Sequence, residues 1–324
     1  MEEILRVENL SVNIHKGKEV FNAVNQLSFS IGHSQVLGLV GESGCGKSIT
    51  NLAIMKLLAP NVKSTGDIWF NEKRISEMDD KQFNDLRGNE IAMIFQDSIS
   101  GLNPLIKVGH QVEEVFTKRK KMSKEVAKEK VLELFEKVRI PNPQMTYNKY
   151  PHELSGGQRQ RVMISLAIAC KPKLLIADEP TTALDVTTQQ QILNLLLDLK
   201  EEMQMSIIII SHDLNVIRKM CDNILVMYAG KVVEKGRCIE VLSKPRHPYT
   251  LSLMKSIPSI ASKGKLLECI AGTVPSVEDR PKDNQCLFAD RCNRKCMNYQ
   301  DVSVYTNISE THQILCQRKG DLYD

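Results

Sequence analysis

The chain has 324 residues, 42% of them hydrophobic, and its 43 basic and 39 acidic residues give a formal net charge of +4. This length allows one large domain, or a large domain with an appendage, around a substantial buried core. The charge excess is too small to indicate nucleic acid as a partner. No apolar stretch approaches the ~20 residues of a membrane span. The acidic start, Met1–Ile4, lacks the features of a signal peptide, so we expect a cytosolic chain.

The first hundred residues are expected to be rich in strands. Residues 4 to 40 alternate apolar and polar positions, which predicts short antiparallel strands. The apolar run Val36–Val40 predicts a strand, followed after a glycine-rich loop by a helix over Ser48–Met55. Gly66–Asn71 and Ile91–Gln96 are predicted to be further strands.

The glycine-rich loop matches the pattern G-x-x-x-x-G-K-[ST], between a strand and a helix as that pattern requires. Its glycines let successive backbone N–H groups point at phosphate oxygens at the positive end of the following helix. The lysine adds a positive charge, and the serine hydroxyl is a ligand for Mg²⁺. The residues predicted to bind the nucleotide here are Gly41, Ser43, Gly44, Cys45, Gly46, Lys47, Ser48 and Ile49.

The second part of the chain changes to helical and then to alternating patterns. Apolar residues within Lys124–Val138 recur at spacings of three and four, which predicts an amphipathic helix. Strand patterns at Leu174–Asp178 and Ser206–Ser211 enclose a helical stretch, Gln189–Met203. That order predicts a βαβ unit and a mainly parallel sheet. Ile224–Glu234 reads as a closing hairpin.

Asp178 and Glu179 stand at the end of a buried strand. Beside a phosphate loop, Asp178 can hold Mg²⁺, usually through water, and Glu179 can activate the attacking water. An acidic pair that caps a helix is the alternative interpretation.

A second potential anion site follows at Leu154-Ser155-Gly156-Gly157-Gln158. Ser155 and the two glycines would place backbone N–H groups at another helix N-terminus. One γ-phosphate does not need two cradles from one chain.

This LSGGQ segment resembles the signature of the ATP-binding cassette (ABC) family. The resemblance covers roughly residues 4 to 240 and implies that Ser155, Gly156, Gly157 and Gln158 close over ATP held by another subunit. Gln96 resembles the Q-loop glutamine, which contacts Mg²⁺ and water, and Glu179 the catalytic glutamate. Asp185 resembles the D-loop aspartate at the dimer interface, and His212 the switch histidine at the γ-phosphate.

Two positions depart from the family pattern. Where the family places an aromatic ring on adenine, this chain offers Ile14 or His15, so the adenine-stacking residue is not identified. Ile49 stands where a hydroxyl residue is common, so the contact with the α-phosphate is expected from the backbone.

The carboxy-terminal cysteines Cys286, Cys292, Cys296 and Cys316 contain no C-x-x-C pair. Four thiolates can hold Zn²⁺ or an iron–sulfur cluster, and unliganded thiols are the third interpretation. Residues 246–250, 272–275 and 286–292 resemble the extension of ATPase subunits from oligopeptide, dipeptide and nickel importers. Some members of that group bind a [4Fe-4S] cluster, which is therefore the ligand expected here, with Zn²⁺ as the alternative.

Together these features predict an α/β P-loop NTPase of the ABC cassette type, with a mainly parallel core sheet, an antiparallel β subdomain and a helical subdomain. The expected domains are a nucleotide-binding domain at 1–243, with its helical subdomain at about 97–170, and a cysteine-containing extension at 244–324. The expected cofactors are ATP and Mg²⁺.

The expected function is hydrolysis of ATP to power import of peptides or nickel-type solutes, at the cytoplasmic face of the membrane. The expected partners are two integral membrane permease subunits, a second ABC ATPase subunit (a paralogue) and, through the permeases, an extracellular solute-binding protein. No nucleic-acid partner is expected. The alternative is a soluble ABC ATPase that acts on nucleic acid or ribosomes, and a further hypothesis makes the extension a redox or metal sensor.

Overall fold

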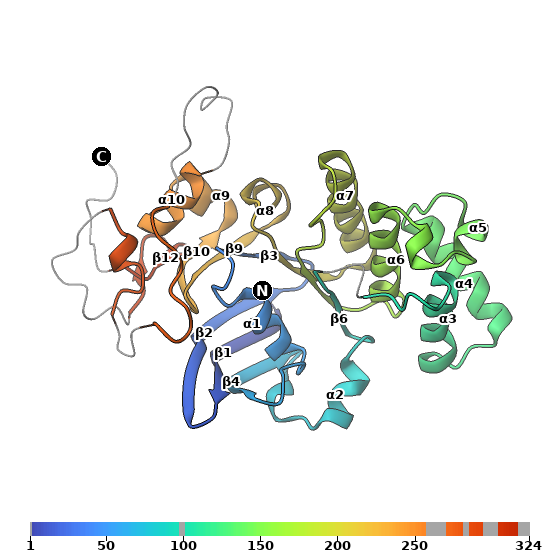
Figure 1. Ribbon diagram of the computed structural model, residues 1–324, viewed down its shortest axis with the longest axis horizontal. Coiled ribbons are helices and arrows are strands. Elements are labelled where there is room, and N and C mark those ends of the chain that lie inside the picture. The colour runs from blue at the N-terminus through green and yellow to red at the C-terminus, as the bar shows by residue number, and fades with distance from the viewer. Residues whose placement is uncertain (1, 97–100, 257–269, 281–284, 294–303, 317–324) are drawn as a thin grey trace. The chain divides into compact units, whose positions relative to one another are not determined.

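A computed structural model of the chain describes residues 2–96, 101–256, 270–280, 285–293 and 304–316 (Figure 1). The chain divides into two compact units. The helical unit comprises Met1–Ile4, Gly32–Ser34 and Met78–Ile209, and the loop unit comprises Leu5–Ile31, Gln35–Glu77 and Ile210–Asp324. Across the described ranges, no helix has the length and apolar content needed to cross a membrane.

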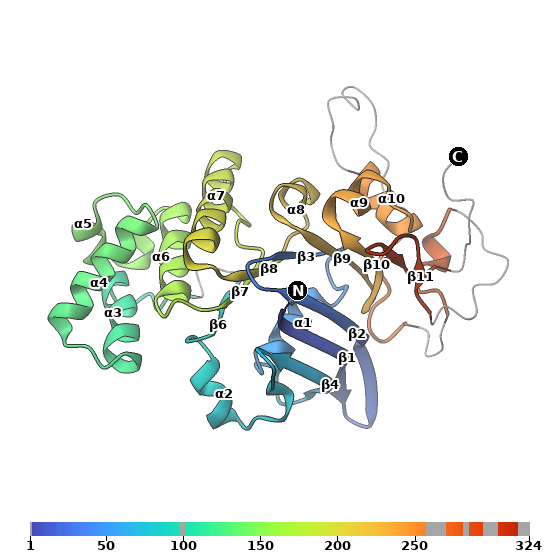
Figure 2. The same ribbon diagram turned by 180° about the vertical axis from the view of Figure 1, so that it is seen from behind.

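In the helical unit, the four helices between residues 108 and 168 pack into one bundle, as both ribbon views show (Figures 1 and 2). The unit contains, in chain order, α2 (Asp80–Leu86), β6 (Ile91–Ile94), α3 (Val108–Arg119), α4 (Lys124–Lys137), α5 (Pro143–Tyr147), the 3₁₀ turn η2 (Pro151–Glu153), α6 (Gly156–Ile168), β7 (Leu174–Asp178), α7 (Val186–Met203) and β8 (Ser206–Ile210).

Helix α4 shows why the bundle forms. It starts after Ser123, whose hydroxyl accepts a hydrogen bond from the backbone N–H of Val126 at 3.4 Å. This cap satisfies one of the donors that the first helical turn leaves without a partner. The stripe predicted from the spacing is buried: Ala127, Val131, Leu134 and Phe135. The predicted helix is thereby confirmed, one residue shorter at its end.

The strands of the helical unit are ordered β8-β7-β6. Strands β6 and β7 are parallel, with Ile91 opposite Leu174 and Ile94 opposite Ala177. Every residue of β7 and β8 is buried, as near-continuous apolar runs predict. The predicted strand Leu174–Asp178 matches β7 residue for residue, so Asp178 stands at the carboxyl end of a buried strand.

The loop unit begins with a four-stranded sheet in the order β2-β1-β4-β5. Its strands are β1 (Glu3–Lys16), β2 (Glu19–Gly32), β4 (Val62–Phe70) and β5 (Lys73–Arg74), with the 3₁₀ turn η1 (Ile75–Glu77) next. Strand β4 is antiparallel to β1 and to β5. The prediction of short strands was wrong, because β1 and β2 each run for 14 residues. A bulge between Glu8 and Ser11 interrupts the alternation without ending β1.

The second sheet of the loop unit has the order β11-β12-β10-β9-β3. The elements of this part are β3 (Val36–Val40), α1 (Lys47–Ile54), α8 (Leu214–Met220), β9 (Asn223–Tyr228), β10 (Lys231–Arg237), α9 (Cys238–Ser243), α10 (Pro248–Lys255), the 3₁₀ turn η4 (Ala289–Arg291), β11 (Thr306–Asn307) and β12 (Gln313–Ile314). Strands β3 and β9 are parallel, whereas β10 is antiparallel to β9 and to β12.

The turn from β9 to β10 confirms the predicted hairpin. Ala229 and Gly230 both have positive φ, 46° and 89°, as a two-residue hairpin turn requires.

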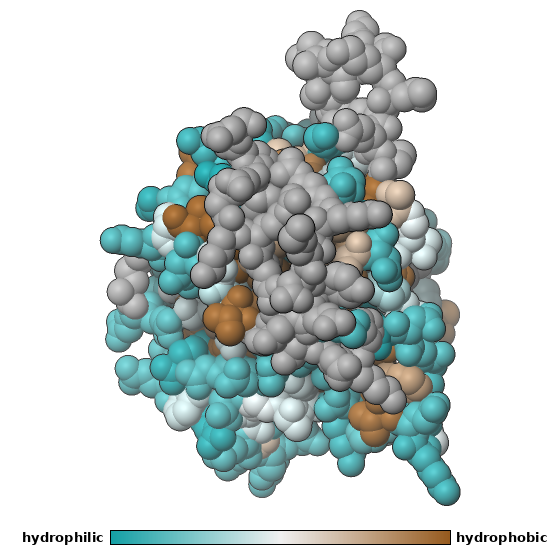
Figure 3. Space-filling model, turned by 90° about the vertical axis from the view of Figure 1, so that its left-hand side faces the viewer, coloured by the Kyte–Doolittle hydropathy of each residue, from teal (hydrophilic) through white to brown (hydrophobic). Residues whose placement is uncertain are grey.

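On the side of the molecule that carries α10 and β12, the described surface is mostly hydrophilic, with hydrophobic residues in separate groups (Figure 3). Parallel pairs in both units, an antiparallel sheet and a helical bundle confirm the predicted α/β class.

Candidate nucleotide site

The phosphate loop joins β3 to α1 with glycines that no other residue can replace without strain. Gly41, Gly44 and Gly46 have φ of 149°, 78° and 110°, the region that L side chains rarely adopt. A Cβ atom added to Gly41 would lie 2.2 Å from the carbonyl oxygen of Met227, a backbone atom that cannot move aside. One side of the loop therefore lies against β9, whereas a Cβ added to Gly44 would meet no described atom within 4 Å.

Lys47 is the first residue of α1, and only 7% of it is exposed. Its Nζ donates hydrogen bonds to the carbonyl oxygens of Gly41, at 2.8 Å, and Glu42, at 2.9 Å. Burial of a charged amine is costly unless hydrogen bonds satisfy it, and here the loop itself provides them. A glycine cradle with its lysine folded onto it fits a polyphosphate, because phosphate oxygens can replace the two carbonyls.

The residues next to Lys47 differ in burial and in hydrogen bonding. Thr50 Oγ1 donates to the carbonyl oxygen of Gly46 at 2.8 Å, which fixes the first turn of α1. Cys45 is fully buried, and this burial raises the pKa of its thiol, so the thiol stays neutral at physiological pH. Ser48 is exposed and Ile49 half-buried, and both remain predicted ligands.

Two predicted catalytic residues meet at the end of β7. Gln96 follows β6, Glu179 follows β7, and the Nε2 of Gln96 donates to the Oε2 of Glu179 at 3.0 Å. The hydroxyl of Thr182 donates to the same oxygen at 2.9 Å. Glu179 has a φ of 46°, so its backbone departs from the extended conformation of β7. Asp178, the last residue of β7, is 5% exposed.

The predicted signature segment forms the start of α6. The Oγ of Ser155 accepts from the N–H of Gln158 at 3.3 Å, and the Oε1 of Gln158 accepts from the N–H of Ser155 at 3.1 Å. This reciprocal pair is a capping box. The two glycines also have a packing role that the sequence did not reveal. A Cβ added to Gly157 would lie 2.6 Å from Cγ2 of Thr188, and one added to Gly156 would lie 3.1 Å from Cδ2 of Leu184.

Asp185 and His212 occupy two different local settings. Asp185 caps α7, because its Oδ1 accepts from the N–H of Thr188 at 3.0 Å. Hydrogen bonds from Thr188 lower the pKa of this carboxyl group, which keeps it ionised. His212 is exposed, in a turn where the hydroxyl of Ser211 accepts from the N–H of Asp213 at 3.0 Å.

The structure thus brings together Gln96 and Glu179, and it places Ser155–Gln158 beside the D-loop region of the same unit. The phosphate loop and His212 belong to the loop unit. Ile14 and His15, the positions for an adenine contact, are half-buried at the end of β1.

Three residues of the carboxy-terminal extension also reach the phosphate loop, and sequence reasoning missed them. The hydroxyl of Tyr249 accepts from the N–H of Glu42 at 2.8 Å. Arg291 pairs with the carboxylate of Glu42, and Arg280 donates to the carbonyl oxygen of Gly44 at 3.0 Å. These partners lie between 207 and 249 residues apart in sequence, so no local pattern indicates them.

The predicted iron–sulfur cluster, and with it the zinc alternative, was wrong. Within the described ranges no three or more His, Cys, Asp or Glu side chains gather as metal ligands. Cys286 lines a cavity of only about 10 Å³, without a second cysteine among its lining residues, and Cys316 is buried beside Ile314. Cys296 lies outside the described residues. Relatives named below as peptide transport proteins do not support the cluster either.

A glycine cradle with a buried lysine, between a buried strand and a helix, defines a P-loop nucleoside triphosphatase. Comparisons with known proteins narrow this class. Residues 24–182 match the family model "ABC transporter", and residues 233–297 match "Oligopeptide/dipeptide transporter, C-terminal region".

Curated relatives match over nearly their whole length. The chain is 43% identical to the oligopeptide transport ATP-binding protein OppD of Bacillus subtilis, over 96% of this chain and 87% of the relative. It is 45% identical to the dipeptide transport ATP-binding protein DppD of Haemophilus influenzae, over 89% and 87%.

Solved structures agree. A dimeric ATP-binding cassette in a post-hydrolysis state, bound to ADP and phosphate, matches with a TM-score of 0.65 and 29% identity, over 72% of this chain and 98% of that one. CbiO1 from Clostridium perfringens, part of an ABC transporter complex, matches with a TM-score of 0.64 and 28% identity, over 75% and 92%. The chain belongs to the ABC transporter family of ATP-binding proteins, in the branch that carries the oligopeptide/dipeptide transporter C-terminal region.

Proposed function

We propose that this chain is the ATP-hydrolysing subunit of an importer for peptides or for nickel-type small solutes. The observation that carries the proposal is the presence in one chain of a cassette match and a peptide-transporter extension match. Relatives at 43% and 45% identity carry names of oligopeptide and dipeptide transport. None of these names refers to nucleic acid or ribosomes.

The proposed roles at the nucleotide follow from the sequence motifs and the family resemblance. Lys47 and the backbone amides from Gly41 to Ser48 would hold the phosphates, and Ser48, Gln96 and Asp178 would hold Mg²⁺. When bound, Mg²⁺ withdraws negative charge from the phosphate oxygens. Glu179 takes a proton from the attacking water, and the hydrogen bond from Gln96 at 3.0 Å orients the carboxylate that does so.

Completion of the site requires a second cassette in this proposal. Ser155–Gln158 would close over a nucleotide held by the partner, with Asp185 at the interface and His212 at the γ-phosphate. The capping box leaves the N–H groups of Gly156 and Gly157 at the start of α6, where an anion is stabilised. The importer resemblance favours a paralogue as the second cassette.

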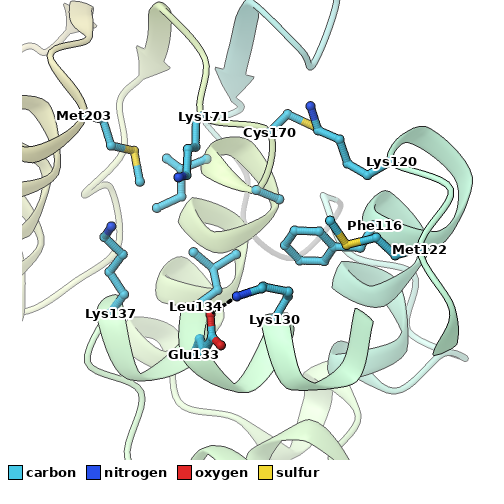
Figure 4. A pocket seen from close by; sticks show the side chains of 12 residues that line it. Phe116, Lys120, Met122, Lys130, Glu133, Leu134, Lys137, Cys170, Lys171 and Met203 are labelled. Atoms are coloured by element: carbon cyan, nitrogen blue, oxygen red, sulfur yellow. Dashed lines mark hydrogen bonds and ion pairs between the residues drawn. The ribbon is translucent and has the colours of Figure 1, made fainter. Parts of the chain in front are cut away.

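We place the docking site for the separate permease subunits on the helical bundle. A cavity of about 370 Å³ opens there between α3, α4 and the ends of α6 and α7, and Figure 4 shows its lining. Phe116, Met122, Leu134 and Met203 provide apolar surface, and Lys120, Lys130, Lys137 and Lys171 surround it.

The charge of this cavity predicts the chemistry of its partner. Lys130 pairs with Glu133 at 2.7 Å, and Lys137 pairs with Glu202 at 2.5 Å. The net positive charge of the cavity therefore comes from Lys120 and Lys171. An amphipathic cytoplasmic helix of a permease, with carboxylates beside apolar anchors, fits this lining. The extracellular binding protein would act through the permeases, and the chain would lie at the cytoplasmic face of the membrane as a peripheral subunit.

The test is affinity purification of the tagged chain from detergent-solubilised membranes, with mass spectrometry of all partners. We expect two integral membrane proteins and a second cassette, and ATPase activity of the complex that rises with a peptide-loaded binding protein. Recovery of ribosomes or nucleic acid without membrane proteins would refute the transport function.

The docking site is tested in the same purification. The double variant Lys120→Glu with Lys171→Glu should reduce permease recovery at least tenfold, because it reverses the charge of the cavity rim. The matched control is Lys81→Glu, an exposed lysine on α2 that does not line the cavity. Equal recovery with both variants would place the docking site elsewhere.

A further inference from the structure

Glu42 is the only acidic residue of the phosphate loop Gly41–Ser48, and it stands directly after the first glycine. Since Cys45 remains a neutral thiol, the carboxylate of Glu42 is the single negative side chain in a cradle that suits an anion. A free carboxylate at this position would repel the phosphates of a bound nucleotide.

The carboxy-terminal extension provides the counter-charge. Arg291 donates from Nη1 to one oxygen of Glu42 at 2.8 Å and from Nη2 to the other at 2.9 Å. The side chain of Arg291 is 6% exposed and that of Glu42 is 29% exposed. A two-point pair that is largely shielded from water is held more firmly than an exposed ion pair.

Further contacts within the loop unit hold Arg291. Its Nε donates to the carbonyl oxygen of Ala271 at 2.8 Å, and its guanidinium lies 5.7 Å from the centre of the Tyr228 ring. The hydrogen bonds to Glu42 are the main reason that the pKa of Arg291 is raised. The charge on this guanidinium is therefore permanent at any physiological pH.

The backbone of the loop is tied to the same extension. Tyr249 accepts the N–H of Glu42 and lies against Tyr228 and Phe288, with ring centres 4.7 Å and 5.4 Å away. Arg280 joins the carbonyl oxygen of Gly44, at 3.0 Å, to that of Ala23, at 2.9 Å. The extension thus holds the amide, the carboxylate and a carbonyl of the loop at once.

We propose that Arg291 is a positioning residue for nucleotide binding: it neutralises Glu42 and holds its carboxylate on the extension side of the loop, so that the cradle accepts a polyphosphate. This inference rests on the proposed function, because it assumes that the loop binds ATP. It gives the carboxy-terminal extension a direct influence on ATP affinity, in addition to any contact the extension makes with partners.

The proposal predicts an electrostatic signature that a purely structural contact would not give. Arg291→Ala should weaken MgATP binding to the full-length chain roughly tenfold, because a carboxylate then faces the phosphates at short range. The loss should be larger for ATP than for ADP and should shrink as salt rises from 0.05 M to 0.5 M. Arg291→Lys should lie between the wild type and Arg291→Ala, since it keeps the charge but loses the paired geometry.

The decisive variant is the double one. If repulsion by Glu42 causes the loss, Arg291→Ala with Glu42→Gln should bind MgATP within about threefold of the wild type. If Arg291 only stabilises the fold, the double variant should bind as weakly as Arg291→Ala or worse, and that result would overturn the proposal. Thermal unfolding of each variant separates a binding effect from a loss of folded protein.

Two controls separate this inference from the proposed function. Glu278→Gln breaks an exposed ion pair that the extension makes with Lys16 and not with the phosphate loop, and it should leave MgATP affinity unchanged. Lys47→Ala should abolish MgATP binding. If it does not, the proposed nucleotide site itself is wrong. If Lys47→Ala abolishes binding and Arg291→Ala matches the wild type at every salt concentration, only the role of Arg291 fails.

Discussion

The side-chain amide of Gln96 donates a hydrogen bond to the carboxylate of Glu179 at 3.0 Å, across the ends of two neighbouring parallel strands. An amide that donates to a carboxylate limits its rotation. In the proposed mechanism this contact orients a base that must be ionised to take a proton from water.

Glu179→Gln tests the base. The glutamine keeps the size of the side chain and an oxygen that can accept from Gln96 and Thr182, but it cannot take a proton. We expect the turnover of ATP in the assembled transporter to fall at least a hundredfold, with MgATP affinity within a few-fold of the wild type. Steady-state phosphate release and equilibrium binding measure the two quantities, and unchanged turnover would contradict the assignment.

Gly157→Ala tests the packing of the signature segment. The new Cβ would meet Cγ2 of Thr188 at 2.6 Å, so we expect a loss of about 1–3 kcal/mol in the free energy of unfolding. Adding Thr188→Ser to Gly157→Ala removes the opposing methyl group, so the double variant should recover most of the lost stability. Gly156→Ala is the matched control, because its Cβ meets only the flexible end of Leu184, at 3.1 Å. Chemical denaturation compares the four proteins, and equal stability of the two alanine variants would refute the steric account.

His247 predicts a pH dependence of stability. It is 2% exposed, its Nδ1 accepts from the N–H of Tyr249 at 3.1 Å, and burial lowers its pKa to about 4. Between an ordinary pKa of about 6.5 and this value, the unfolded chain binds a proton that the folded chain does not. Neutral His247 therefore contributes at most roughly 3 kcal/mol to the free energy of unfolding above pH 6.5, and this contribution is lost as the pH falls toward 4.

His247→Asn provides the comparison for that prediction. Asparagine keeps a cap acceptor at the start of α10 and does not titrate in this range. Denaturant unfolding from pH 7 to pH 4 should show a shallower decline for the variant than for the wild type. Other groups that face this site, Glu234 and His312, are unchanged in both proteins. Parallel declines would mean that His247 does not contribute.

The sequence predicted helices and strands correctly where their formation depends only on residues close together in the chain. The buried run of β7 and the amphipathic spacing of α4 need only neighbouring residues, and both were located to within one residue. The long strands β1 and β2 were predicted as shorter pieces, because a bulge near Asn9 interrupts the alternation of β1 and a positive φ of 51° at Gln26 interrupts that of β2. Local alternation does not distinguish a bulge from a strand end.

Contacts between distant residues were beyond such reasoning. Arg291 and Glu42 are 249 residues apart, and only the folded chain shows that one neutralises the other. The glycines of the signature were predicted for their backbone N–H groups, while the contact of Gly157 with Thr188 depends on how α6 and α7 pack. The iron–sulfur cluster was expected from the family resemblance and not from the cysteine spacing, and a resemblance does not establish that the cysteines lie close together in the fold.

The contact of Tyr249 with the N–H of Glu42 has a practical consequence for anyone who shortens this chain. A fragment that ends at residue 243, after α9, retains every motif of the cassette but lacks Tyr249, Arg280 and Arg291. Its phosphate loop would keep its sequence and lose its outer support. Weak ATP binding by such a fragment would then result from the loss of these contacts with the phosphate loop. It would be misread as evidence that the motifs are defective.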